Sequence, residues 1–178
     1  LHAGGKFDNS SYKVSSGLHG VGVSAVNATS AWLRLEVKRD GKVWQQSYVK
    51  GAPEAPLKAV GDTDVTGTKL RFLPDRDIFS MTDFSYDVLA ERLRELAFLN
   101  SGLRIRLNDE RPGGKNDIFE YRGGIQEFVA TKTASKEPVH ADVIHFEHTS
   151  ETVIDDVAAP VVIEVAMQWT SAYQESIF

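Results

Sequence analysis

Glycines concentrate near the start of the chain, directly before a run that can form a helix. They stand at Gly4, Gly5, Gly17, Gly20 and Gly22, and the run VSAVNA follows at residues 23–28. A glycine leaves room for a ligand to reach the backbone amides that a side chain would cover. A helix that begins just behind the glycines adds unpaired N–H groups and the positive end of its dipole. The pattern therefore predicts a loop that cradles a phosphate chain.

Two common phosphate-binding motifs do not fit this loop. The Walker A motif ends in Lys-Ser or Lys-Thr, and neither dipeptide closes the glycine run. The dinucleotide fingerprint is G-x-G-x-x-G behind a strand, whereas Gly17, Gly20 and Gly22 are spaced G-x-x-G-x-G with no strand before them. From the residues alone, the loop is either a less common phosphate site or a flexible Gly-Ser connection between two elements.

The rest of the chain predicts an α+β fold. Residues 84–100 form the best helical pattern, with Leu89, Leu93, Leu96 and Ala97 on one stripe and Gly102 beyond its end. Asp40-Gly41 predicts a hairpin turn between two alternating segments. Strands are expected at 31–38, 43–49, 68–73, 103–107, 118–121, 139–146 and 161–169, with short helices at 21–29 and 125–132.

Composition excludes several classes of protein. The 178 residues contain no cysteine, which rules out disulfides and thiolate metal sites and is consistent with a reducing cytoplasm. No apolar run reaches membrane-spanning length, so no membrane partner is expected. The net charge of −5 argues against the chain acting alone as a bulk nucleic-acid binder. The spacing of His140, His145 and His148 suits no single strand or helix face, so no metal site is predicted.

Several motifs together carry a resemblance to a known family. HAGGKF followed by SGLHGVGVSAVNA resembles the ATP lid and second glycine box of the DNA gyrase B subunit family, within the type II topoisomerase ATPases and the wider GHKL superfamily. The similarity continues through Thr66-Gly67-Thr68, LRELAFLNSG at residues 93–102, YRGGI at 121–125 and Met167-Gln168-Trp169. It covers the whole chain, and the LRELAFLNSG run favours gyrase over the topoisomerase IV ATPase.

The resemblance implies a fold and a division into domains. Residues 1–122 are expected to hold the ATP lid and the C-terminal half of a two-layer GHKL-type ATPase sandwich. Residues 123–178 are expected to begin a ribosomal-S5-like transducer domain, a second α/β unit. Because the chain starts with Leu1 and stops at Phe178 inside a strand-like pattern, we expect an internal fragment of a longer protein.

The resemblance also assigns nucleotide-binding residues. The loop residues that would wrap the β- and γ-phosphates are Gly17, Leu18, His19, Gly20, Val21 and Gly22. Lys6 matches the lid lysine that reaches the γ-phosphate, Tyr12 matches a nucleotide-contacting position, and Thr68 matches the threonine near the adenine amino group. For Tyr12 packing of the lid is nearly as good an interpretation, and for Thr68 the plain alternative is an ordinary strand residue.

One residue in the loop departs from the family pattern. Ser16 stands where the family usually has a glycine, which restricts positive φ there. The unperturbed pKa of a histidine lies near neutrality, so His19 invites the role of a general base. We rank loop packing above catalysis for it, since in the family this histidine serves the loop.

Catalytic groups of the family are absent from this sequence. The base glutamate, the Mg²⁺-holding asparagine and the adenine-reading aspartate are expected upstream, and the lysine of Q-T-K is expected downstream. The cofactors implied are ATP and Mg²⁺, with the metal ligand outside the segment. We therefore expect the parent protein to be an ATP-dependent type II DNA topoisomerase and this chain alone to hydrolyse no ATP. The implied partners are DNA, the gyrase A subunit and a second gyrase B chain.

Three alternatives remain open from the sequence. The first is the topoisomerase IV ATPase subunit, which decatenates DNA. The second is a non-hydrolysing nucleotide-binding module of the same fold, whose full gene would lack the upstream glutamate. The third is an α+β binding domain in which the glycine loops are only turns, and which would bind no Mg-ATP.

Overall fold

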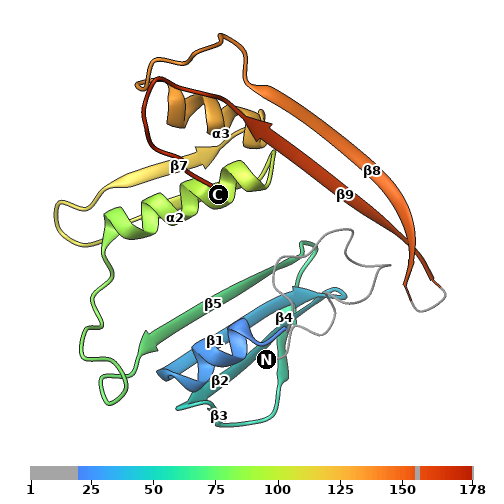
Figure 1. Cartoon of the computed structure of the whole chain (residues 1–178). Helices are drawn as coiled ribbons and strands as arrows, with labels where there is room; N and C mark the ends of the chain where they lie inside the picture. The colour runs from blue at the N-terminus through green and yellow to red at the C-terminus, as the bar shows by residue number, and fades with distance from the viewer. Residues whose placement is uncertain (1–19, 155–156, 178) are drawn as a thin grey trace. The chain divides into compact units, whose positions relative to one another are not determined.

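The computed structural model describes residues 20–154 and 157–177, which form two compact units (Figure 1). The units divide between Asp83 and Phe84. Helices and antiparallel sheets both occur, as the α+β prediction requires, and the arrangement is compatible with a GHKL-type fold. This division is not the one expected between an ATPase part and a transducer part after residue 122, which stays a prediction.

The first unit, within the described residues, has one short helix and a five-stranded antiparallel sheet. Its elements are α1 (Gly22–Ala28), β1 (Ser30–Arg39), β2 (Lys42–Val49), β3 (Ala52–Pro53), β4 (Lys58–Asp62) and β5 (Gly67–Pro74). The strand order is β3-β2-β1-β5, and β4 pairs with a different stretch of β2. Strand β1 therefore lies between β2 and β5.

Two tight turns set the register of this sheet. Asp40 and Gly41 have φ angles of 53° and 72° and join β1 to β2, which confirms the predicted hairpin. Lys50 and Gly51 repeat the pattern with φ angles of 47° and 83° and join β2 to β3. The segment after Gly51 begins with this short strand, which lies at one end of the described sheet.

The sheet has one apolar and one polar face, as the alternation in 31–38 predicts. Leu33 is fully buried and lies opposite Tyr48 on β2 and Phe72 on β5. Arg34, the next residue on β1, points to the other face, opposite Ser47 and Arg71.

The second unit packs two helices with two hairpins. Its elements are α2 (Tyr86–Leu99), β6 (Arg104–Asn108), β7 (Asn116–Glu120), α3 (Gly124–Thr133), β8 (Ile144–Ile154) and β9 (Val157–Met167). Strands β6 and β7 pair with each other, as do β8 and β9. The core is made by Ala90 and Ala97 of α2 against Phe119 of β7. Phe98 stacks on Tyr121 with ring centroids 3.6 Å apart.

Helix α2 matches the predicted helix, and its buried stripe shares Ala97 with the predicted one but leaves Leu96 out. Ser85 caps its N-terminus by accepting a hydrogen bond from Val88 N at 3.5 Å, and Gly102 takes the left-handed φ of 81° expected of it. Ala90, Ala97 and Phe98 are buried, whereas Leu96, expected on the apolar stripe, is 44% exposed. The stripe is therefore rotated toward Ala90 and Phe98, which face the β6-β7 hairpin and α3.

The last two strands differ from their expected bounds. Strand β8 begins at Ile144 rather than at residue 139, and β9 ends at Met167 rather than at 169. Their pairing runs from Ile144 opposite Met167 to Ile154 opposite Val157, which extends both strands toward the turn. No helix in the part of the chain that the structure describes is long and apolar enough to cross a membrane.

Candidate functional site: the glycine loop and the start of α1

Three of the predicted loop residues lie within the described part of the chain. Gly20 is buried and has a φ of 67°, a conformation that an L side chain rarely adopts. Val21 is 51% exposed and precedes Gly22, the first residue of α1. A Cβ built on Gly22 would meet nothing within 4 Å. The backbone here is therefore a glycine-dependent bend with open space beside it, which fits a cradle for phosphate oxygens.

The remaining loop and lid predictions lie outside the described residues. They are Lys6, Tyr12, Gly17, Leu18 and His19. Their assigned contacts stay predictions.

Thr68 lies in the same unit, on strand β5, which is the last strand of the described sheet. It is exposed and sits opposite Val37 of β1, on the face of the sheet that carries Leu33. Among the described residues no hydrogen bond joins Thr68 to Gly20–Gly22, so the two parts of the predicted site are not linked directly there.

Asn27 fixes α1 to the second tight turn of the sheet. Its Nδ2 donates a hydrogen bond to Gly51 O at 3.1 Å, and the residue is only 7% exposed. Its Oδ1 is buried without a hydrogen-bond partner in the described part of the chain. A Cβ on Gly51 would lie 3.2 Å from Ala28 Cα, so both the positive φ and the close approach require glycine there. The sequence alone predicted no role for Asn27 and did not point to Gly51.

A second anchor holds the end of α1 against the end of β5. Asp75 is 6% exposed, and its backbone N–H donates to Thr29 O at 3.0 Å. Lys50 places its Nζ 3.4 Å from Asp75 Oδ2 and 2.7 Å from Asp77 Oδ2. The hydrogen bond to Asp77 and the charges of both carboxylates raise the pKa of Lys50. These contacts fix the base of the glycine loop, and only the folded chain brings them together.

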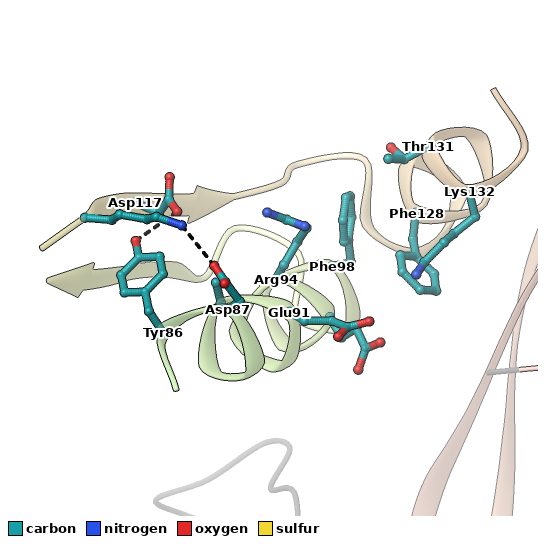
Figure 2. A pocket seen from close by; sticks show the side chains of 12 residues that line it. Tyr86, Asp87, Glu91, Arg94, Phe98, Asp117, Phe128, Thr131 and Lys132 are labelled. Carbon is teal, nitrogen blue, oxygen red and sulfur yellow. Dashed lines mark hydrogen bonds and ion pairs between the residues drawn. The ribbon is translucent and has the colours of Figure 1, made fainter. Parts of the chain in front are cut away.

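The second unit contains a pocket of about 410 Å³ between α2, β7 and α3 (Figure 2). Tyr86, Phe98 and Phe128 give it aromatic walls, and charged groups line the rest. The Tyr86 hydroxyl donates to Asp117 Oδ2 at 2.9 Å. Lys115 pairs with Asp87 at 3.1 Å and also lies over the Tyr86 ring, 5.6 Å from its centroid.

Burial and the carboxylates around Tyr86 keep its hydroxyl protonated. Burial, the hydrogen bond to Asp117 and the nearby carboxylates raise the pKa of Tyr86 to about 12. A neutral phenol that donates to a carboxylate is a structural link between α2 and β7, because it neither carries charge nor releases a proton near neutral pH.

Two of the three histidines considered for a metal site have other partners. Trp169 N donates to His140 Nε2 at 3.1 Å, and His140 Nδ1 lies 2.7 Å from Asp142 O, so Nδ1 carries the proton. His145 Nε2 lies 2.9 Å from Glu164 Oε1. Within the described residues, no group of three or more possible ligands is placed to hold a metal ion.

Comparison with known proteins shows which family this chain belongs to. No family model matches the chain. The curated DNA gyrase B protein of Thermotoga maritima is 48% identical over 177 residues, which is 99% of this chain, and that of Halalkalibacterium halodurans is 49% identical over 179 residues and all of it. The gyrase B protein of Haloferax volcanii is 49% identical over 181 residues and 99% of the chain. The chain belongs to the DNA gyrase B family. It spans 28%, 27% and 27% of the length of these three relatives.

Membership of the gyrase B family confirms the resemblance drawn from the lid and glycine motifs. It favours gyrase over the topoisomerase IV alternative.

Proposed function

We propose that this chain is the part of a gyrase B protein that holds the phosphates and the adenine end of ATP. The observation that carries the proposal is the glycine-dependent bend at Gly20, directly before α1, in a chain that is 48% identical to a gyrase B relative. The backbone amides of residues 17–22 bind the β- and γ-phosphates, and Lys6 supplies a positive charge at the γ-phosphate. Tyr12 contacts the nucleotide from the lid, and Thr68 hydrogen-bonds at the adenine.

The residues of this chain bind and orient the nucleotide without supplying the hydrolytic base. Hydrolysis needs a base to activate water and a metal to balance charge. In this proposal, the base and the residue that holds the metal lie in segments outside this chain. Mg²⁺ accompanies the bound nucleotide. The 178-residue chain alone is therefore expected to show no ATP turnover.

The whole protein couples ATP binding and hydrolysis to DNA strand passage and negative supercoiling. It does so with the gyrase A subunit and a second gyrase B chain, in the cytoplasm. Nucleotide binding is the step that closes the two gyrase B chains onto each other. Relaxed circular DNA, gyrase A and ATP should give negative supercoils with the whole protein, whereas decatenation without supercoiling would contradict the gyrase assignment.

Nucleotide binding is tested by substituting two glycines that have similar positive φ angles. Gly20→Ala and Gly41→Ala both place a side chain at a positive φ, 67° and 72°, but only Gly20 belongs to the loop. In the whole protein, Gly20→Ala should weaken binding of a non-hydrolysable ATP analogue at least about tenfold, and Gly41→Ala less than about twofold. Equal affinities for both variants, or no nucleotide binding by the wild type, would refute the proposal.

A further inference from the structure

The polar face of the first unit's sheet gathers positive charge from three strands. We call this the basic face and define it by the side chains that share the side of Arg34. Its cations, among the described strand residues, are Arg34 and Lys38 of β1, Lys58 of β4, and Lys69 and Arg71 of β5. Glu36 of β1 is the one carboxylate among them. The chain as a whole has a net charge of −5, so this face is opposite in sign to the rest.

The strand register brings these residues together. Arg34 lies directly opposite Arg71, and Glu36 lies opposite Lys69 on β5 and Gln45 on β2. Gln45 in turn lies opposite Lys58 of β4. Residues that pair directly across antiparallel strands point to the same face, so the cations share one surface.

The cations of the basic face are not neutralised by the fold. Within the part of the chain that the structure describes, none of the five forms an ion pair. Glu36 accepts a hydrogen bond from Gln45 Nε2 at 3.0 Å instead. On the opposite face Lys42 is paired with Asp62 at 2.7 Å. Like charges directly across a strand pair cost stability, so the arrangement of Arg34 and Arg71 favours an anion from outside.

The shape of the basic face fits an extended polyanion. Four strands at about 4.8 Å spacing and the four-residue step from Arg34 to Lys38 give a surface of about 14 by 14 Å. A hollow of about 270 Å³ lies at its centre and is lined by Arg34, Glu36, Gln45, Ser47, Lys69 and Arg71. A groove of B-DNA is about 6 or 12 Å wide, so cations at both sides of this surface can reach phosphates on both sides of one groove.

We propose that the basic face binds the phosphate backbone of duplex DNA. A single-strand site would need exposed aromatic rings for base stacking, and the half-buried Trp32 ring already has the Arg34 guanidinium over it at 5.2 Å. Contacts to phosphates position a duplex without reading its sequence, so binding is sequence-independent. The basic face is separate from the predicted adenine contact, because Thr68 points to the other face of β5.

Fluorescence anisotropy of a labelled duplex with the 178-residue chain tests the proposal. The double variant Arg34→Gln/Arg71→Gln should weaken binding at least about fivefold at low salt and lower the log–log salt slope by about two. The matched control is Arg39→Gln/Arg76→Gln, which removes the same charge from two exposed arginines outside the basic face. It should stay within about twofold of wild type, as should Arg34→Lys/Arg71→Lys.

Four outcomes would overturn the assignment. Equal loss in the two Gln double variants would mean that net charge alone governs binding. Absence of any duplex binding by the wild type at low salt would mean that no such site exists. Tighter binding of a single strand than of the duplex would contradict the duplex assignment. Full displacement of DNA by inorganic tripolyphosphate at equal charge concentration would indicate a compact polyphosphate site. ATP-analogue affinity is measured separately, so a failure here leaves the nucleotide proposal standing.

Discussion

The pocket of the second unit and the basic face of the first unit hold their charged side chains in opposite ways. In the second unit, charges around the pocket meet a partner: Lys115 meets Asp87, and Arg94 lies over the Phe119 ring at 5.5 Å. On the basic face of the first unit, Arg34 faces Arg71 across the strands. Charges that are paired within a fold contribute to its packing, whereas unpaired like charges are available to a ligand.

The largest effect on stability is expected when an aromatic side chain in the wall of the pocket is truncated. Phe98 is 2% exposed, stacks on Tyr121 and contacts Phe128 with ring centroids 5.1 Å apart. Phe98→Ala should lower the free energy of unfolding by about 3–5 kcal/mol, because it removes buried surface and leaves a cavity. Urea denaturation followed by circular dichroism measures this. Leu96→Ala, two residues earlier on the same helix but 44% exposed, should cost clearly less, and an equal cost would disprove the rotated stripe of α2.

A smaller effect, on the pH dependence of the stability, is expected at Tyr86. Its pKa in the folded chain is about 12, above the ordinary value of 10.0, so folding favours the neutral phenol. The stabilisation is complete below pH 10 and is lost as the pH rises from about 10 to about 12. Tyr86→Phe should therefore flatten the fall of the urea midpoint over that range.

Tyr48 serves as an internal reference for this measurement. Burial also raises the pKa of Tyr48, and Tyr48 remains in both proteins, so the difference between them isolates Tyr86. Asp117→Asn should lower the pKa of Tyr86, because it removes the carboxylate that accepts the phenol's hydrogen bond. An unchanged slope in Tyr86→Phe would show that the phenol is not linked to folding.

The smallest effect on stability is expected for two arginines that differ in the residue opposite them on the neighbouring strand. Arg71 faces Arg34, whereas Arg104 of β6 faces Glu120 with Nε 3.5 Å from Oε2. Arg71→Thr should raise the free energy of unfolding, and Arg104→Thr should lower it, each by about 0.2–1 kcal/mol. Thermal or urea unfolding of both variants gives the signs. Effects of the same sign would remove the contrast between the two units.

Local patterns predicted most of the regular elements. The Asp40-Gly41 turn was predicted because two consecutive positive φ angles favour this dipeptide, and the structure has both. The helix at 84–100 was predicted within two residues at its start and one at its end. The ends of β8 and β9 were wrong by several residues, since strand ends depend on the partner strand and not on local alternation.

The candidate site was predicted unevenly for the same reason. Glycine spacing predicted a loop over residues 17–22, and Gly20 within it has a positive φ, which is a local property of a residue. The anchors of α1 were missed: Asn27 contacts Gly51 across 24 residues, and Lys50 contacts Asp77 across 27. An asparagine in a short predicted helix does not reveal from the sequence which distant residue it contacts.

The sequence by itself determined the family, the α+β class, the glycine bend and the alternation that separates Leu33 from Arg34. The family follows from motifs along the whole chain, and the other three follow from residue identity over a few neighbouring positions. Only the tertiary structure decided that Arg34, Lys58 and Arg71 share one surface, because strand order and register set which residues of β1, β4 and β5 lie side by side. It also decided that Ala90 and Phe98 are buried rather than Leu96, since the helix rotates to the face that its neighbours cover.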